Sequence, residues 1–351
     1  MIKFFRKIRY NLMSQNKTGK YLKYAIGEII LVVFGILIAL QVSNWNEVRK
    51  SNLKTEALLD KFEDELVLTI KNANHDIKNS IIGDSVMKRV LKNKVTRQDY
   101  INDDQLRTLI TWRFTLNPEL DNLEKLVEKE EELGDDYNEV IHLINRFSYI
   151  REREVDAMNL LRLSSEENSD FISLNFPWAR LSDSLSNEAA YQYFLTDENY
   201  KNRLYAHWKK CMNYNRIIMN YRTQMLEILS KLKIIREAYT PTQLEDLFKN
   251  LEQKPFERIE ANKSMNDIYP DDQLAKSSLI ANFTKDTLQI IIKNKKGDEL
   301  NSYEARPGRI FTTRTSRTDL YSDNLKIIEV YKNGICIEKY KEVQYGYLIL
   351  K

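Results

Sequence analysis

His207 and Cys211 are the one pair of residues whose types and spacing could support covalent chemistry. They stand four residues apart in a segment with helical periodicity, so both side chains lie on one helix face. A neighbouring imidazole lowers a thiol pKa and prepares a nucleophile. Both residues, however, occupy positions of an apolar seam that we expect to be buried, and no third catalytic group accompanies them. A structural role is therefore the expectation, and we predict no catalytic residue.

Other signatures of chemistry are missing from the sequence. It has no GxGxxG, GxxxxGK[ST], GxSxG, HExxH or CxxC motif, which excludes the common nucleotide, hydrolase and zinc signatures. His75 and His142 belong to separate predicted helices. We therefore expect no enzyme activity, no metal and no cofactor. The acidic run is interpreted as a solvated surface: Glu128, Glu130, Glu131, Glu132, Asp135 and Asp136.

Two further groups of residues leave alternatives open. A disulfide between Cys211 and Cys336 is compatible with an oxidising compartment, but it would join a helical seam to a β-strand. A Tyr-rich stretch could line a ligand pocket or a partner surface, and packing in the core or at its rim is the favoured interpretation. It contains Tyr191, Tyr193, Tyr200 and Tyr205.

Composition indicates long, uninterrupted secondary structure. Nine Gly and six Pro among 351 residues fall well below the typical ~7% and ~5%. Residues 1–42 carry a net charge of +6 and the whole chain +3, so residues 43–351 carry 3 − 6 = −3. A nucleic-acid-binding domain needs a basic patch on its folded part. We therefore expect no nucleic-acid partner.

Residues 24–45 have the length and composition of a transmembrane helix. Twelve consecutive apolar or Gly residues run from Ile29 to Leu40, and 22 residues at 1.5 Å rise span about 33 Å, against ~30 Å of hydrocarbon. A buried core helix would not need seven cations before it, and the best candidate for a signal-peptide cleavage site, Gln41-Val42-Ser43, fits the required pattern poorly. We expect a retained span in a lipid bilayer. Its interfacial anchors are Lys20, Tyr21, Lys23, Tyr24 and Trp45.

The distribution of Lys and Arg predicts the orientation of this span. Seven lie in residues 1–23 and four in the twenty residues that begin at Ser43. The positive-inside rule therefore places the N-terminus in the cytoplasm and the bulk of the chain outside. Residues 1–23 form a basic amphipathic segment suited to the membrane surface.

Three residues inside the span carry weaker signals. Gly27 and Gly35 share nearly one helix face and could let another helix approach, although their spacing of eight is not that of the common dimer motif. Glu28 lies about one turn inside the membrane, where acids are costly. We interpret Glu28 as reaching the cytoplasmic interface, in preference to a proton-relay or partner-binding role.

The residues of this N-terminal region resemble those of a known family. The opening MIKFFRKIRYNL and the stretch GKYLKYAIGEIILVVFGILIALQVSNWNE at Gly19–Glu47 are similar to the N-terminal signature of uncharacterised single-pass envelope proteins from two-membraned bacteria. The resemblance implies an inner-membrane protein with its bulk in the periplasm, a helical body and a closing segment like Val330–Leu350. It implies no activity and no catalytic residue.

Two apolar seams with alternating steps of three and four residues predict long helices. The first runs from Trp45 to Ala73 and continues the span outward, in a helix expected from about Tyr24 to the Ile81–Gly83 region. The second requires a partner helix, either the first seam running antiparallel or another subunit. It comprises Leu204, His207, Cys211, Tyr214, Ile218, Tyr221, Met225, Ile228, Leu232 and Ile235.

Shorter elements complete the predicted bundle of residues 46–252. Asn117 and Pro118 start a helix that reaches about Leu133, another runs from Tyr137 to about Leu163, and residues 164–177 form a loop. Two more short helices are expected at 186–195 and 242–252. After a linker at 253–276, residues 277–351 have six short strand-like runs and an Asn333-Gly334 hairpin signal. They predict a small β-sandwich or barrel.

The predicted fold class is mainly α: a transmembrane helix continuing into a coiled-coil-like bundle, then a small all-β module, α+β overall. We expect a membrane-anchored periplasmic scaffold or sensor-like protein that acts through a protein partner or as a homo-oligomer. The alternative is a membrane-tethered enzyme or small-ligand receptor whose site is assembled from scattered bundle residues. A buried ionisable cluster in a concave pocket would favour the enzyme or receptor. An exposed apolar stripe would favour the scaffold or sensor-like protein.

Overall fold

The computed structural model confirms the predicted order, with helices up to Asn250 followed by strands. It describes residues 10, 18–114, 120–180, 188–259, 278–294, 296–313, 326–343 and 346–351; in the first helix, the side chains of residues 18–21, 24 and 25 are not described. The predicted amphipathic segment 1–23 lies mostly outside these residues, as do Asn117 and Pro118. The chain forms two compact units, Met1–Leu59 and Asp60–Lys351.

Three long helices dominate the α region, and short ones connect them. The long helices are α2 (Thr18–Leu91), α6 (Asn138–Asn175) and α8 (Glu198–Glu237). The shorter α-helices are α3 (Arg97–Asn102), α4 (Gln105–Thr108), α5 (Asp121–Val127), α7 (Glu188–Thr196) and α9 (Pro241–Asn250). The 3-10 turns are η1 (Leu109–Thr111), η2 (Glu130–Glu132), η3 (Asp135–Tyr137) and η4 (Pro177–Arg180).

Helix α2 is longer than predicted and enters the bundle later. Its 74 residues pass through Gly83 without a break. Along the first seam, Trp45, Val48 and Asn52 are exposed, whereas Phe62 and Leu66 are fully buried. The predicted bundle starts at residue 46, whereas burial along this helix begins at Thr55 and the second compact unit at Asp60. A heptad pattern shows which face is apolar, but not where along the helix a partner begins.

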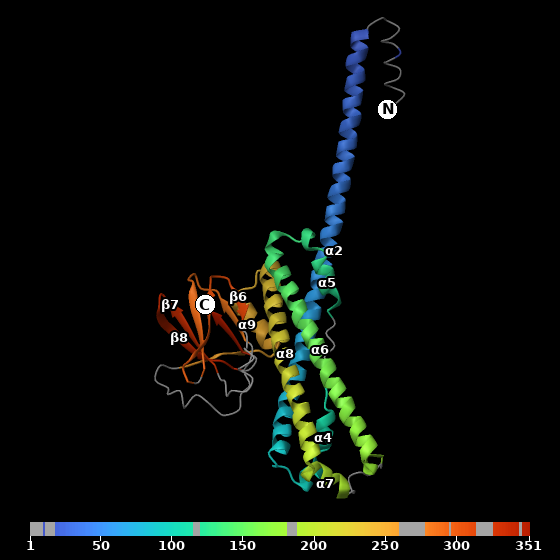
Figure 1. Cartoon of the computed structure of the whole chain (residues 1–351). Helices are drawn as coiled ribbons and strands as arrows, with labels where there is room; N and C mark the ends of the chain where they lie inside the picture. The colour runs from blue at the N-terminus through green and yellow to red at the C-terminus, as the bar shows by residue number, and fades with distance from the viewer. Residues whose placement is uncertain are drawn as a thin grey trace. The chain divides into compact units, whose positions relative to one another are not determined.

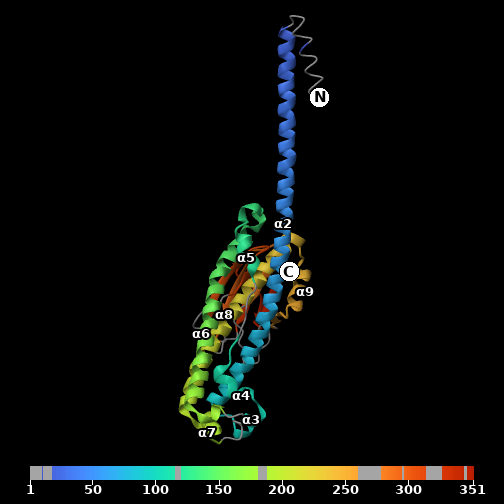
Figure 2. The same ribbon diagram turned by 90° about the vertical axis from the view of Figure 1, so that its right-hand side faces the viewer.

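Helix α8 is the centre of the bundle and runs antiparallel to both other long helices (Figures 1 and 2). Its contacts with α2 run from Arg236 with Asp60 (2.6 Å) to Trp208 with Asp84 (2.7 Å). On the α6 side, Lys231 pairs with Glu139 at 2.5 Å. The second seam is thus packed within one chain, the intramolecular arrangement of the two left open by the sequence.

Helix α6 continues through the segment predicted as a loop. Residues 164–175 are helical, and three of their polar side chains, Ser164, Ser165 and Asn168, are buried and bind α8 or the backbone of residues 110 and 111. Ser165 Oγ donates to the Thr111 carbonyl at 2.7 Å, and Asn168 Nδ2 donates to the Ile110 carbonyl at 2.7 Å. A Ser- and Asn-rich stretch favours loops when its side chains compete for the local backbone, but here they are bound to another segment.

The β module is built from two sheets with a shared core. The first sheet has the order β1-β9-β3-β6 and is mixed, and the second has the antiparallel order β2-β8-β7-β4-β5. The strands are β1 (Lys254–Pro255), β2 (Glu257–Arg258), β3 (Leu279–Asn282), β4 (Leu288–Lys293), β5 (Glu299–Ala305), β6 (Ile310–Thr312), β7 (Ile327–Lys332), β8 (Ile335–Lys341) and β9 (Gly346–Leu350). Side chains from both sheets, including Ile280, Ile290, Ile328 and Leu348, form one apolar cluster. This arrangement is a small sandwich.

Two details of the β region differ from, or sharpen, the sequence prediction. The predicted linker begins instead with strands β1 and β2, which pair with β9 and β8, and its residues 260–276 lie outside the described part. The predicted hairpin at Asn333-Gly334 is present, with φ of 51° and 78°. Two successive positive φ angles are the signature of the turn that Asn-Gly favours. Strand β5, whose residues are mostly polar, was not predicted.

Candidate functional site

The exposed half of α2 carries the predicted membrane anchor. From Ile26 to Val42 its large apolar side chains are exposed, and Trp45 is 65% exposed, with the Arg49 guanidinium 6.0 Å from its ring. Within the described residues, α2 is the one helix long and apolar enough to cross a membrane. Lys23 is exposed as well, whereas the side chains of Lys20, Tyr21 and Tyr24 lie outside the described part.

The positions predicted to lie inside the membrane keep an open surface within this chain. A methyl group added at Gly27 or Gly35 would meet no atom within 4 Å. Glu28 is half-buried. The close approach of a second helix at the two glycines therefore stays a prediction.

The second seam lies in the core of the bundle. Nine of its ten residues are buried, and Ile235, near the end of α8, is half-buried. Between Tyr214 and Leu232 almost the whole circumference of α8 is buried, because β6 and β3 contact the helix in addition to its helical neighbours. Polar residues of that stretch, such as Glu227, consequently become part of the interior.

The His207–Cys211 pair has the environment of a structural pair. The His207 ring is fully buried, its Nδ1 lies 3.0 Å from Ser164 Oγ and its Nε2 lies 2.7 Å from the Trp112 carbonyl. Burial lowers the pKa of His207 to about 4, and burial raises the pKa of the Cys211 thiol to about 12. A neutral imidazole with both nitrogens occupied does not activate a thiol. His207 joins α8 to α6 and to the segment after η1.

The other sequence candidates are dispersed. Cys211 and Cys336 are free thiols. His75 and His142 are exposed on α2 and α6, and no cluster of three or more metal-ligating side chains occurs in the described ranges. The acidic run from Glu128 to Asp136 is exposed.

The Tyr-rich stretch forms part of an aromatic core at the α7–α8 corner. Tyr193 and Tyr200 are buried, with ring centroids 5.1 Å apart, and both contact Phe194. Tyr191 is buried as well, with the Arg97 guanidinium 4.5 Å from its ring. Tyr205 is partly exposed and stacks on Trp208. These contacts are those of packing.

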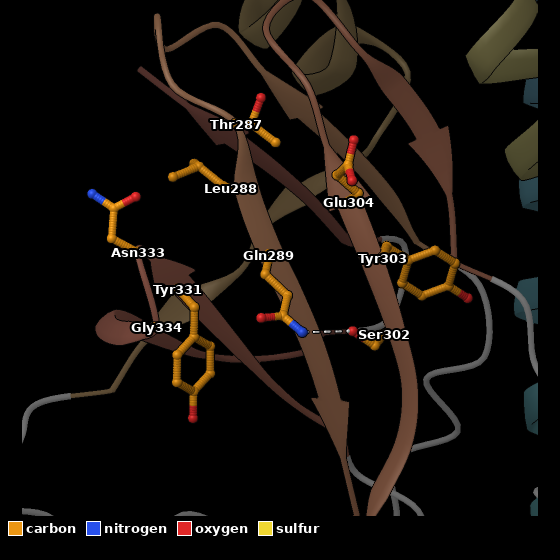
Figure 3. Close-up of a pocket in the computed structure, with 9 residues that line it drawn as sticks. All are labelled: Thr287, Leu288, Gln289, Ser302, Tyr303, Glu304, Tyr331, Asn333 and Gly334. Atoms are coloured by element: carbon orange, nitrogen blue, oxygen red, sulfur yellow. Dashed lines mark hydrogen bonds between the residues drawn. The ribbon is translucent and has the colours of Figure 1, made fainter.

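A shallow pocket of about 320 Å³ lies on the antiparallel sheet of the β module (Figure 3). Its lining comes from β4, β5 and the β7–β8 hairpin: Thr287, Leu288, Gln289, Ser302, Tyr303, Glu304, Tyr331, Asn333 and Gly334. Gln289 Nε2 donates to Ser302 Oγ at 3.2 Å across its floor. The one carboxylate in the lining, Glu304, is paired with Arg306 at 2.6 Å. The pocket therefore offers neutral amide and hydroxyl groups beside tyrosine rings.

Charged residues beside this pocket fix its wall. The Tyr331 hydroxyl donates to Glu329 at 2.8 Å, and Glu329 also pairs with Lys293 and Lys339, each at 2.7 Å. Burial acts to raise the pKa of Glu329, but these hydrogen bonds outweigh it and hold that pKa at about 2. The Tyr331 side chain is thereby held in one place on the sheet.

A buried acidic site in the bundle was missed by sequence reasoning. Glu154 of α6 is fully buried, and neither of its carboxylate oxygens has a hydrogen-bond partner. Asp76 of α2 contributes a negative charge that acts on Glu154. The Tyr221 hydroxyl of α8 is also buried and has no hydrogen-bond partner. Burial raises the pKa of Glu154 to about 7, the charge of Asp76 adds to the rise and Arg151 opposes it. In sequence, Glu154 lies within the charged run REREVD and reads as a surface residue.

Comparisons with known proteins add no relative. No protein-family model, no curated protein and no solved structure matches the chain.

Proposed function

We propose that the protein is a single-pass membrane protein of the bacterial inner membrane, with its N-terminus in the cytoplasm, that holds the bundle and β module in the periplasm to bind another protein. The observation that carries the proposal is the exposure of the α2 side chains from Ile26 to Val42. Such a continuous apolar surface is unfavourable in water. A bilayer covers it, and the excess of cations in residues 1–23 supports the stated orientation.

Features of the bundle surface support an interaction role. Helix α6 exposes four large apolar side chains along its outer side, at Tyr149, Leu160, Leu163 and Leu174. Its inner side is packed, and the His207–Cys211 pair is held in a structural role. These features support a role in binding, through surfaces of the bundle or β module, better than a role in catalysis.

Topology is tested by a reporter that is active only in the periplasm. Fused after Lys351, it should be active, and fused before Met1 it should be silent. The reverse pattern would overturn the orientation, and extraction of the chain by alkaline carbonate without detergent would overturn the membrane span.

The interaction is tested by photo-crosslinking in intact cells. A crosslinking amino acid placed at Leu160 or Leu163 should give a discrete adduct with one protein, or with a second copy of the chain. Asn159, exposed on the same helix, serves as the matched control position. Equal, diffuse labelling at all three positions would speak against a binding surface on α6.

A small-ligand receptor is the second candidate, favoured by the pocket on the β module. Volumes of this order accommodate small ligands. Native mass spectrometry of the purified protein should then show a bound small molecule that is lost on Tyr331→Ala and retained on Lys285→Ala. Lys285 is exposed and outside the pocket lining.

A further inference from the structure

Glu154 occupies a position that the packing of the bundle does not explain. It lies on the inner face of α6, fully buried, and both carboxylate oxygens lack a hydrogen-bond donor. Buried polar groups in folded proteins are nearly always hydrogen-bonded, and a buried charge without a partner is strongly unfavourable. An aliphatic residue of similar size would pack there without this penalty.

The groups around Glu154 come from each of the three long helices. From α2, the Asp76 carboxylate acts on it as a negative charge and accepts a hydrogen bond from the Tyr214 hydroxyl at 2.9 Å. From α8, the buried Tyr221 hydroxyl has no hydrogen-bond partner, and the charge of Glu154 acts to raise its pKa. From α6 itself, Arg151 supplies the opposing positive charge, but its guanidinium is partly exposed and pairs with Glu124 at 3.6 Å. Asp76 in turn has the exposed His75 beside it.

These contacts give the two protonation states of Glu154 different consequences. The neutral carboxylic acid is compatible with the closed core, because it adds no second negative charge beside Asp76. The carboxylate form of Glu154 is a buried charge without a donor and adds a second negative charge near the half-buried Asp76, which favours separation of α6 from α2 and α8 and the entry of water. Protonation of the Glu154 carboxyl therefore favours the closed bundle.

We propose that Glu154 makes the packing of α6 against α2 and α8 proton-dependent, so that the bundle is closed in mild acid and opens more often as the pH rises. This device goes beyond the proposed function and does not rest on it, since it uses contacts within Asp60–Lys351. Loss of the proton from the Glu154 carboxyl to water is the only chemical step. In a sensor, it would couple external acidity to exposure of bundle surfaces.

The two free cysteines provide the test. Cys211 is buried in the bundle on α8, whereas Cys336 is partly exposed on β8, so alkylation of Cys211 by N-ethylmaleimide reports opening and Cys336 is the internal reference. The alkylation rate of Cys211 is measured at each pH for the full chain and for Glu154→Gln, both in detergent micelles. The ratio of the two rates cancels the pH dependence of the thiol and of His207. Glu152→Gln, exposed on the same helix, is the matched control.

Between about pH 6 and about pH 8, the ratio of Cys211 alkylation rates, wild type over Glu154→Gln, should rise about tenfold, because the closed and open states differ in their affinity for the Glu154 proton. The ratio of Cys211 alkylation rates, wild type over Glu152→Gln, should stay constant. The rate of Cys336 alkylation in wild type, divided by that in either variant, should also stay constant. A pH-independent ratio for Glu154→Gln would overturn the proposal.

A second measurement does not depend on the variant folding. In the unmodified chain, amide hydrogen exchange corrected for its intrinsic pH dependence should show about tenfold less protection in α6 at the higher pH, with the β module unchanged. Unchanged protection of α6 would contradict the proposal. Both readouts use purified protein, so their failure is separate from failure of the topology or crosslinking experiments.

Discussion

The Tyr214 hydroxyl of α8 donates a hydrogen bond of 2.9 Å to the Asp76 carboxylate of α2, across 138 residues of sequence. On the other side of Tyr214, the Phe114 ring stacks at 5.3 Å with an interplanar angle of 1°. The second seam is therefore occupied by the protein's own α2 and its connecting segment, and a partner subunit is not needed to bury it.

Truncation of the seam should destabilise the isolated chain. Ile218 and Met225 are fully buried, so Ile218→Ala or Met225→Ala is expected to cost about 2–5 kcal/mol through lost burial and a residual cavity. Charged replacements at the same sites should prevent folding. Urea unfolding followed by circular dichroism measures the change, and the half-buried Ile235→Ala is the milder comparison. Equal effects at all three positions would contradict the described packing.

His207 and Glu154 should give opposing pH dependences of stability. The pKa of His207 falls from its usual 6.5 to about 4, so its contribution is complete above 6.5 and is lost as the pH falls towards 4. The pKa of Glu154 rises from 4.5 to about 7, so stability is lost as the pH rises through that window. Each shift corresponds to about 3 kcal/mol.

Because the two windows overlap, removal of one group should reveal the other. Glu154→Gln should gain stability steadily between about pH 4 and pH 6.5, whereas His207→Gln should lose it between about pH 4.5 and pH 7, each by about 3 kcal/mol. The measurement is the free energy of unfolding of each variant at a series of pH values. Parallel profiles for the two variants would show that the groups do not titrate as described.

Gly83 is required by the close approach of Trp112. A methyl group at Gly83 would lie 3.0 Å from Cζ3 of the indole. Gly→Ala in an exposed helix gains about 1 kcal/mol, but here we expect a loss of about 1 kcal/mol, because the ring must move. In a Trp112→Leu background the same substitution should be stabilising. A gain in both backgrounds, measured by thermal unfolding, would argue against the contact.

The Arg146–Glu227 pair should be sensitive to removal of one partner. Glu227 is buried at the junction of α8, α6 and β6, where Arg146 lies 3.2 Å away and Thr312 donates to it. Arg146→Met should cost about 2–4 kcal/mol, because it leaves a buried carboxylate without its main counter-charge. Arg146→Met with Glu227→Gln should recover most of that loss. If the double variant is no better than the single one, the pair is not coupled.

Elements whose signals are local can be predicted from the sequence. The run from Ile29 to Leu40 predicts an apolar helix from composition alone, Thr240-Pro241 predicts the start of α9, where Thr240 caps the helix, and Asn333-Gly334 predicts a hairpin. These depend on side-chain polarity and backbone preferences within a few residues, which a sequence displays directly.

Which polar residues are interior depends on how distant segments pack in three dimensions. Ser164 and Asn168 indicate a loop by composition, yet they bind His207 and the Ile110 carbonyl and keep α6 helical. Glu154 reads as a surface charge, and it becomes the buried site because α2 and α8 both close over that face of α6. The energy of a polar side chain depends on the donors and charges that distant segments bring to it, and no local pattern contains that information.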